Sequence, residues 1–233
     1  MNPSTPGTPR DQPNRTTSDR TDRPQSDQLR PMSAEEIADS YGDVADELAR
    51  WSRLERLFAG RYRRRQFENA AGRVLDVACG TGRNFRYLTT ATDVVGIDIS
   101  DEMLAHARDE LDGLALDGTL HRMDAQALAF PADSFDTVIS SFATCTFPDP
   151  ITALRELQRV CKPGGQLLFL EHSRSDVAPL AWLQDWRAES HYQTAGCQLN
   201  HEPLETVQKT ELVIEKTDEQ LFGLVTGIEA TPP

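Results

Sequence analysis

The feature that most constrains the fold is a hydrophobic run that ends in an acid and a glycine-rich turn. Residues 74–82 read Val-Leu-Asp-Val-Ala-Cys-Gly-Thr-Gly. A buried strand followed at once by small residues is typical of the first unit of an α/β domain, where ligands bind at the carboxyl ends of the strands. We therefore predict a strand over 73–77, a ligand-binding turn over 78–82 and a helix from about Arg83, whose N-terminus would favour a negatively charged group.

Strand-like and helix-like segments alternate beyond this unit. The β-rich runs are 93–97, 119–123, 135–140 and 166–170, and the helical patterns are 101–111, 150–160, 178–190 and 202–208. Such alternation predicts parallel strands joined by crossover helices. The runs 211–217 and 221–229 follow each other too closely for a crossover, so they predict an antiparallel pair. The expected α/β fold is a Rossmann-like, doubly wound, mostly parallel seven-stranded sheet with an antiparallel C-terminal strand pair.

The chain ahead of this core differs in composition. Residues 1–31 contain almost no apolar side chains, so they cannot bury enough surface to offset the entropy cost of ordering. We therefore predict a disordered tail over 1–31 and a domain over 32–233. Within that domain we expect a helical lid at about 33–68 and the core at about 72–233.

The predicted lid begins with a capping box formed by Ser33 and Glu36. Apolar residues then recur at helical spacing, and Gly42 and Gly60 are the points where we expect the helix to break or end. A basic run over 61–65 follows. Charge runs usually form a solvated helix face, which is our preferred interpretation, and contact with an anionic head group is the alternative.

The net charge of the chain is −13. An acidic surface repels nucleic acid phosphates, which argues against DNA or RNA as a partner. No apolar run approaches the roughly 20 residues of a membrane span, and the polar start of the chain has no apolar core of a signal peptide. We therefore expect a cytoplasmic protein without an integral membrane span, for which peripheral membrane contact stays open.

The four cysteines are Cys79, Cys145, Cys161 and Cys197. None of them belongs to a Cys-x-x-Cys pair, so we predict no zinc site, and no other metal site is indicated. Disulfides are uncommon in a domain of this size without an export signal. We therefore expect reduced and mostly buried thiols.

Asp98 strengthens the case for a ligand site at the turn. It ends the run Val94–Ile97, where an acid can accept hydrogen bonds from both hydroxyls of a ribose. Its alternative role, capping the next helix, suits Ser100 better. A nicotinamide-dependent oxidoreductase would need a third glycine near Phe85, which is absent, and no Gly-Lys-Ser/Thr follows to make a phosphate-binding loop.

Several segments together resemble the motifs of class I S-adenosylmethionine (SAM)-dependent methyltransferases. Residues 74–82 resemble motif I, and 94–104 resemble the second motif. Segments within 124–136 resemble the third and fourth motifs, and Cys-Lys-Pro-Gly-Gly at 161–165 resembles the turn before the fifth strand. The resemblance covers about residues 70–172, in the order and at the spacing of the family.

This resemblance implies a SAM site. It assigns the methionine part of SAM to Asp76, Ala78, Cys79, Gly80, Thr81 and Gly82, the ribose to Asp98, the adenine to Ile99, Met103, Asp124 and Ala125, and the methyl-transfer region to Ser140 and Ser141. Tyr41 would close over SAM from the N-terminal helix, with a core role as the alternative. The family usually has glycine at position 78, and because alanine avoids positive φ, we expect an ordinary backbone conformation there.

The methyl acceptor is narrowed by exclusion and by resemblance. Residues 140–143 are Ser-Ser-Phe-Ala, where enzymes that methylate amino groups of nucleic acids and glutamine carry Asn/Asp-Pro-Pro-Tyr. The run Phe169–His172 resembles the phosphatidylethanolamine, quinone and alkyl-thiol methyltransferase groups, and the tail from 195 onward resembles the thiol group in particular. The resemblance thus implies an enzyme for a small-molecule or lipid-like acceptor, of amine, thiol or quinol type.

His172 ends the run that resembles these groups, so it is a candidate base or substrate contact. A purely structural, hydrogen-bonded histidine is an equally good interpretation. For the whole chain, the alternative to an enzyme is a catalytically silent SAM-binding regulatory protein.

Overall fold

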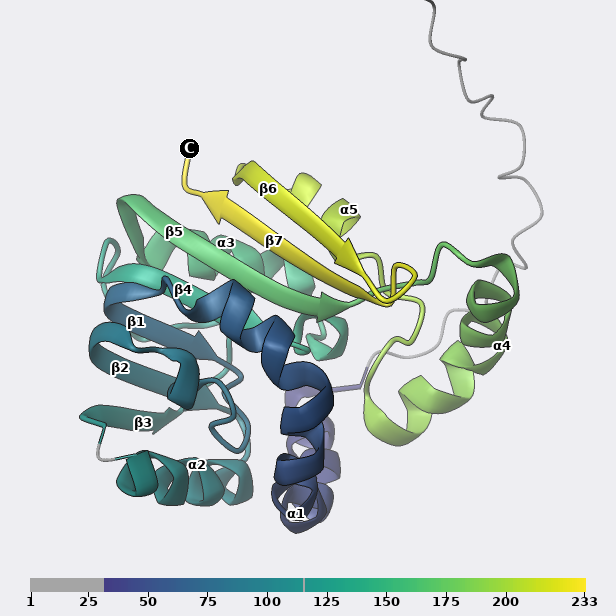
Figure 1. Cartoon of the computed structure of the whole chain (residues 1–233), viewed down its shortest axis with the longest axis horizontal. Coiled ribbons are helices and arrows are strands. Elements are labelled where there is room, and N and C mark those ends of the chain that lie inside the picture. Colours follow the sequence, from purple (N-terminus) through teal and green to yellow (C-terminus); the bar gives the residue numbers. More distant parts are fainter. Residues whose placement is uncertain (1–31, 115) are drawn as a thin grey trace, which may run out of the picture. The chain divides into compact units, whose positions relative to one another are not determined.

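The computed structural model describes residues 32–114 and 116–233, without the side chains of 52–56, so the predicted tail over 1–31 lies outside the described residues. Seven strands form one sheet in the order β3-β2-β1-β4-β5-β7-β6 (Figure 1). Their bounds are β1 Ala71–Val77, β2 Thr90–Asp98, β3 Gly118–Arg122, β4 Phe135–Ser141, β5 Cys161–His172, β6 Val213–Gln220 and β7 Val225–Thr231.

The first five strands pair in parallel, and β7 pairs antiparallel with both β5 and β6. The predicted fold class, a mostly parallel seven-stranded sheet with an antiparallel C-terminal pair, is therefore confirmed.

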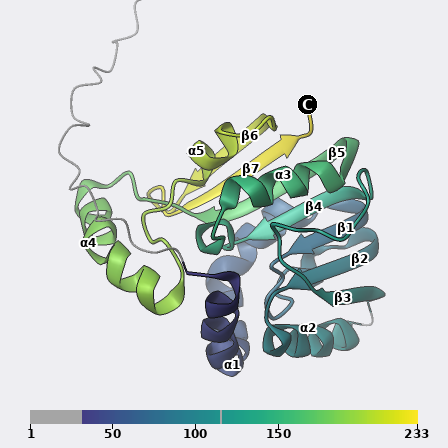
Figure 2. The ribbon, with the colours of Figure 1, turned by 180° about the vertical axis from the view of Figure 1, so that it is seen from behind.

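Helices cover both faces of the sheet. They are α1 Ala34–Phe67, α2 Asp101–Leu114, α3 Pro150–Val160, α4 Ala178–Ala195 and α5 Pro203–Gln208, with two 3-10 turns, η1 Phe85–Tyr87 and η2 Thr144–Thr146. Figure 2 shows α3 and α5 together on one face, and their apolar side chains form a core with Leu75 and Val77 of β1. On the other face, Val74 packs with the end of α1, η1 and α2.

Successive residues of β1 therefore enter opposite cores, as the alternation of a strand requires. Val74, Leu75 and Val77 are fully buried, which stabilises the fold by about 1.5–3 kcal/mol for each side chain. Asp76 shares the face of Val74 and points toward α1 and η1, so the strand places an acid beneath the lid.

The segment predicted as a lid is one continuous helix, α1. Its capping box forms as predicted, with the Ser33 hydroxyl accepting from the Glu36 N–H and the Glu36 carboxylate accepting from the Ser33 N–H. The expected breaks at Gly42 and Gly60 were wrong. A Cβ at Gly42 would lie 2.9 Å from Oε2 of Glu102, so this glycine lets α1 approach the start of α2 closely.

The segment after β1 differs from the prediction. No α-helix begins near Arg83. Turns lead to the short η1, so the helix N-terminus that the sequence predicted after the glycine-rich turn is absent. Gly82 has φ of 77°, and a Cβ there would lie 2.6 Å from the ring of Phe85. The tight turn folds this ring back under the loop, and the chain then passes directly into β2.

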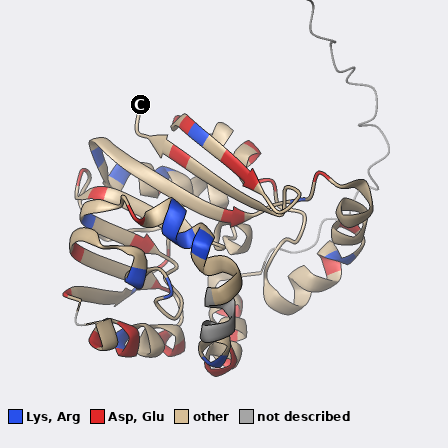
Figure 3. Ribbon diagram, in the orientation of Figure 1, with Lys and Arg blue, Asp and Glu red and all other residues tan. Residues whose placement is uncertain are grey.

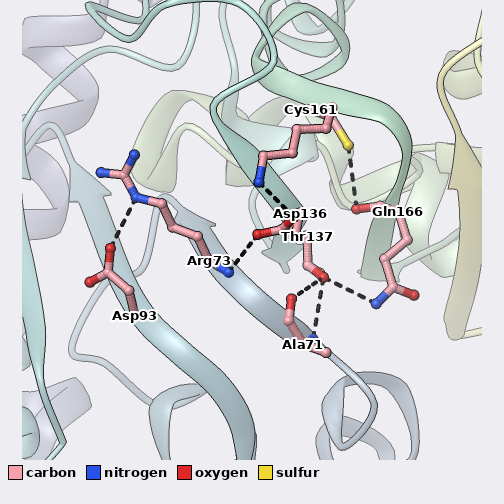
Figure 4. A network of polar contacts seen from close by, with 8 residues as sticks. Ala71, Arg73, Asp93, Asp136, Thr137, Cys161 and Gln166 are labelled. Carbon is pink, nitrogen blue, oxygen red and sulfur yellow. Dashed lines mark hydrogen bonds and ion pairs between the residues drawn. The ribbon is translucent and has the colours of Figure 1, made fainter.

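The amino-terminal edge of the sheet is joined by exposed polar contacts (Figure 4). Asp136 accepts from Lys162 Nζ at 2.7 Å and from the Arg73 backbone N–H at 2.9 Å. Arg73 Nε donates to Asp93 at 2.9 Å, and Thr137 bonds to β1. These bonds connect β1, β2, β4 and β5.

Among the described residues, none of the helices combines the length and apolar character needed to cross a membrane.

Candidate functional site

A pocket lies at the carboxyl ends of β1, β2 and β4, between these strand ends and α1. Eleven of the predicted cofactor residues line it: Tyr41, Ala78, Cys79, Gly80, Thr81, Asp98, Ile99, Met103, Asp124, Ala125 and Ser141. They come from α1, the turn after β1, the end of β2, α2, the loop after β3 and the end of β4. The fold thus brings together residues that the sequence spreads over about a hundred positions.

Asp98 organises one wall of this pocket. Its Oδ2 accepts from the Gly80 N–H at 2.8 Å, and its Oδ1 accepts from the Ser100 N–H at 3.0 Å. Burial raises the pKa of Asp98, and the hydrogen bonds from Ser100 and Gly80 oppose that shift. Ser100 in turn caps α2 by accepting from the Met103 N–H at 3.2 Å, as the sequence predicted.

Gly80 has φ of 56°, and a Cβ there would meet no atom within 4 Å. Its N–H is held by Asp98 while the backbone faces open space. A ligand can therefore approach this backbone closely, which is the property that a glycine provides in such a turn.

The expectation of ordinary backbone at Ala78 was wrong. Ala78 has φ of 51°, and Phe142, after β4, has φ of 54°. A left-handed conformation costs a residue with a Cβ about 1–2 kcal/mol. The Cys79 N–H donates to Ile97 O at 2.9 Å, and the Phe142 N–H donates to Leu170 O at 2.8 Å, so neighbouring strands hold both strained residues in place. Both residues line the pocket, where such strain commonly collects.

Asp76 lies behind the pocket wall and is fully buried. Its two carboxylate oxygens accept from Asn84 Nδ2 at 3.0 and 3.1 Å. Burial raises the pKa of Asp76 to about 7, against the opposing effects of the Asn84 hydrogen bond and the Arg63 charge. The structure therefore brings Asp76 to the site through Asn84, without placing it on the pocket surface.

Arg63 is the main functional candidate that sequence reasoning missed. The basic end of α1 crosses the sheet (Figure 3), and Arg63 from this end lines the pocket with only 5% of its surface exposed. Its Nη1 donates to Ser141 Oγ at 2.6 Å and to Asn84 Oδ1. The interpretation of run 61–65 as a solvated face is therefore wrong at this position. No sequence signal distinguishes Arg63, because it stands among four neighbouring residues of which three are also arginines.

Besides Asp76, three predicted site residues stay outside the pocket lining. Gly82 serves the turn described above. Ser140 is buried, and its Oγ donates to Glu171 Oε1 at 3.4 Å. Glu171 also accepts from the backbone N–H groups of Ala143 and Thr144, at 3.0 and 3.3 Å. Burial raises the pKa of Glu171 to about 7. This carboxylate thus fixes the loop that follows β4.

His172 is the remaining outlier, and it belongs to a second polar cluster. Its Nε2 lies 3.1 Å from Cys197 Sγ, which lies 3.4 Å from Cys145 Sγ. Hydrogen bonding from Cys145 and then the His172 contact lower the pKa of Cys197, against burial. Burial lowers the pKa of His172, but the Cys197 contact and the nearby Glu171 together outweigh this effect and raise the pKa overall.

Tyr41 links this cluster to the pocket. Burial raises the pKa of its phenol, and the nearby Cys145, Cys197 and Asp98 raise it further, so the hydroxyl stays protonated at neutral pH. All four cysteines of the chain are unpaired and buried, as predicted.

Apolar side chains complete the pocket walls. Residues in the lining that the sequence did not single out are Ala34, Ile37, Leu48, Arg83, Met123, Phe142, Ala143, Thr146, Phe147 and Pro148, in addition to Arg63. Leu48 lies seven residues, or two helical turns, after Tyr41, so α1 presents both side chains to the pocket from the same face. Asp124 keeps its own loop in shape by accepting from the Gln126 N–H at 2.8 Å.

Comparison with known proteins agrees with this architecture. Residues 75–169 match the family model described as a methyltransferase domain. The chain is 40% identical over 112 residues to the phosphatidylethanolamine N-methyltransferase of Cereibacter sphaeroides, covering 47% of this chain and 55% of that protein. It is 36% identical over 153 residues to the ubiquinone/menaquinone biosynthesis C-methyltransferase UbiE of Geobacter sulfurreducens, covering 60% and 59%. A SAM-dependent methyltransferase of Aquifex aeolicus superposes with a TM-score of 0.58 at 20% identity, covering 82% and 98%.

The sheet order and the pocket at the carboxyl ends of β1 and β2 define a Rossmann-like ligand-binding domain. The segment that matches the methyltransferase domain model, residues 75–169, spans the strands that build this pocket. The chain covers 55% and 59% of the lengths of the two curated relatives.

Proposed function

We propose that this protein binds SAM in the pocket and transfers its methyl group to a small-molecule or lipid-like acceptor. The observation that carries the proposal is the pairing of Asp98 with the open glycine turn. Asp98 is held by the Gly80 and Ser100 N–H groups, and its carboxylate borders the pocket where a ribose would be bound. The turn over 78–82 would hold the methionine part of SAM, and Ile99, Met103, Asp124 and Ala125 would surround the adenine.

Methyl transfer requires mainly that the acceptor atom and the methyl group are aligned. The departing thioether is neutral, so a methyltransferase works chiefly by holding the acceptor atom in line with the methyl group. Ser141 and Phe142 lie at the end of β4, and Arg63 of α1 donates a hydrogen bond to the Ser141 hydroxyl. We infer that this group shapes the transfer end of the pocket. Asp76 and Asn84 act behind it as positioning residues.

His172 takes no direct part in this proposal. It is absent from the pocket lining and contacts Cys197 instead. That position favours the structural interpretation of His172 over the role of a general base. A base is needed only where the acceptor arrives protonated.

Several features support a lipid-like acceptor. The pocket is walled largely by apolar side chains, and two curated relatives are named as lipid and quinone methyltransferases. On α4, Trp182 and Trp186 stack with 66% and 67% of their surfaces exposed, an arrangement suited to peripheral contact with a lipid surface. The acidic composition supports an acceptor other than nucleic acid, and a cytoplasmic location stays part of the proposal.

Calorimetry with SAM, followed by a screen with methyl-labelled SAM, tests the proposal. Phosphatidylethanolamine vesicles, a quinol and an alkyl thiol represent the acceptor types. We expect SAM to bind and at least one acceptor to become labelled. An Asp98→Asn variant should lose both properties, and Asp93→Asn, at the opposite edge, should keep them. SAM binding without turnover of any acceptor would favour a silent regulatory protein, and no SAM binding would overturn the proposal.

A further inference from the structure

Cys145, His172 and Cys197 converge beside the pocket from three separate elements. Cys145 lies in η2, and His172 ends β5. Cys197 directly follows Gly196, the C-cap residue of α4. The two sulfurs and one imidazole nitrogen all lie within 4.8 Å of one another. Neither the proposed SAM site nor the transfer end of the pocket uses these three side chains.

The spacing of these atoms matches the coordination shell of a thiophilic metal ion. With metal–sulfur bonds near 2.3 Å, two sulfurs on one tetrahedral ion lie about 3.8 Å apart. The Cys145 and Cys197 sulfurs are 3.4 Å apart, and the His172 nitrogen is 3.1 Å from Cys197 Sγ. An ion would therefore need each of these two pairs of atoms to separate by only a few tenths of an ångström. A disulfide, by contrast, requires the sulfurs to close to about 2.05 Å.

The backbone holds each of these residues in place. The Gln198 N–H donates to Cys145 O at 3.2 Å, which joins the Cys197 loop to η2. Gly196 caps α4 in the left-handed conformation, with φ of 64°, and turns the chain so that Cys197 faces η2. Main-chain contacts therefore hold the segments that carry Cys145 and Cys197 close together, so the cluster is preorganised without an ion.

Glu171 holds the loop that leads into Cys145. It is fully buried, and it accepts from the N–H groups of Ala143 and Thr144, the two residues directly before Cys145. Its carboxylate adds negative charge next to His172, which favours a cation at the cluster.

We propose that Cys145, His172 and Cys197 form a binding site for a thiophilic divalent cation of the zinc class. Two thiolates and an imidazole are the ligands that zinc prefers. Binding displaces the protons that remain on the two thiols, and these protons pass to solvent. Three protein ligands leave one tetrahedral position for water or another small ligand. Cys145 lies between Ala143 and Thr146, which both line the pocket, so the ion stands directly behind the pocket wall.

This site lies beyond what the cysteine spacing predicts. The search for Cys-x-x-Cys pairs assumes that ligands are close in sequence, whereas these three are brought together by the sheet and by the end of α4. The site is also independent of the proposed SAM site, since no residue is shared between them.

Metal titration under reducing conditions tests the proposal. Full-length protein is stripped with a chelator, kept with a phosphine reductant, and titrated with Zn²⁺ against a chromophoric chelator and with Co²⁺ by absorption spectroscopy. We expect one equivalent of either ion and a thiolate-to-cobalt charge-transfer band. Cys145→Ala, His172→Gln and Cys197→Ala should each weaken binding by more than the roughly 10–100-fold that losing an outer partner costs.

Cys161→Ala is the matched control. Cys161 is equally buried, but it lies at the amino-terminal edge of the sheet, so this variant should bind the ion as the wild type does. Alkylation of the wild type gives a readout that needs no variant: Zn²⁺ should protect Cys145 and Cys197 and leave Cys79 and Cys161 unchanged.

Three results would overturn the proposal. They are no ion bound by the folded, reduced protein, binding that persists in all three cluster variants, and a Cys145–Cys197 disulfide that forms in air in protein that binds no metal when reduced. SAM calorimetry on the same samples keeps the two questions apart, because failure of the metal site would leave SAM binding intact.

Discussion

The charged side chains at the two edges of the sheet differ in their exposure to solvent. At the amino-terminal edge, Asp136 pairs with Lys162 and Arg73 pairs with Asp93 in solvent-exposed ion pairs, and the Lys162 hydrogen bond lowers the pKa of Asp136. At the carboxyl edge, Asp76 and Glu171 are fully buried, and burial raises the pKa of each to about 7. The same strands thus end in solvated pairs on one side and in desolvated carboxyls on the other.

This contrast separates stability from binding. Exposed pairs contribute about 0–1 kcal/mol each and stabilise the fold slightly. Desolvated acids at a pocket carry a free-energy cost that the fold tolerates, and perturbed pKa values of this kind cluster at functional sites. Changes at the carboxyl edge should therefore have large effects, and matched changes at the amino edge should have small ones.

The largest expected effect is the pH dependence of stability from Asp76. Its folded-state pKa of about 7 lies above the ordinary value of 3.8, so the folded protein binds the proton more tightly than the unfolded chain does. The free energy of unfolding should then fall as pH rises from about 4 to about 7, by an amount on the order of 4 kcal/mol, and level off above pH 7. Glu171, whose pKa burial also raises to about 7, contributes a fall of the same sign. Asp76→Asn should therefore make the slope clearly shallower without removing it, measured by urea unfolding of the SAM-free protein at a series of pH values.

Asp136→Asn provides the control, and its expected sign is opposite. Because the pKa of Asp136 is lowered on folding, its contribution is present above pH 4 and is lost as pH falls through the folded-state pKa. The variant should keep the fall in stability between pH 4 and 7. If Asp76→Asn kept the full wild-type fall as well, the Asp76 carboxyl would contribute nothing to it.

The next effect in size is on SAM affinity. Asp98 accepts two backbone hydrogen bonds, from Gly80 and Ser100, and an amide at this position can accept only one of them well. Hydrogen bonds to a charged group contribute about 1.5–3 kcal/mol each. We expect Asp98→Asn to weaken SAM binding by about a hundredfold, or roughly 2.7 kcal/mol, in calorimetry. Asp93→Asn should leave the affinity unchanged, and a loss of less than about threefold for Asp98→Asn would contradict the assignment.

Arg63→Ala tests the polar support beneath the lid. The change removes the donor to Ser141 and Asn84 and leaves Asp76 without its nearby positive charge. The free energy of unfolding should fall by about 2 kcal/mol, because buried acceptors lose their partner. Arg65→Ala, two residues on, removes only an exposed pair with Asp218 and should stay within about 0.5 kcal/mol of wild type in the same denaturation assay. Equal effects would mean that Arg63 is solvated after all.

The outcome at Arg63 also marks where sequence reasoning stops. Periodicity and turn residues were enough to predict the sheet, its antiparallel end and α3, because these follow from local patterns and from the rules for parallel strands. Most of the pocket could be predicted for the same reason, since strand ends meet at one edge. A charge run, in contrast, does not reveal which of its members turns inward.

The rest of the site could not be predicted because it depends on contacts between residues far apart in the sequence. The contact between Cys145 and Cys197 depends on where α4 ends and how Gly196 turns the chain, and no local pattern encodes this. The missing helix after β1 is a second case: the Phe85 ring packs under the Gly82 turn, so tertiary packing replaces the first helical turns with η1.

The smallest expected effect tests whether the carboxyl edge is strained. Ala78 has φ of 51°, a conformation that costs alanine about 1–2 kcal/mol and glycine nothing. Glycine, however, adds about 0.5–1 kcal/mol of unfolded-state entropy to be lost on folding. Ala78→Gly should therefore raise the free energy of unfolding by about 0.5 kcal/mol. At Gly72, where the amino edge has φ of 71° and a Cβ would lie 2.7 Å from Asp136, the reverse change to alanine should destabilise the protein. A loss of stability in Ala78→Gly would show that position 78 relaxes to ordinary backbone in solution, and Phe142 would then be the remaining strained residue of the pocket lining.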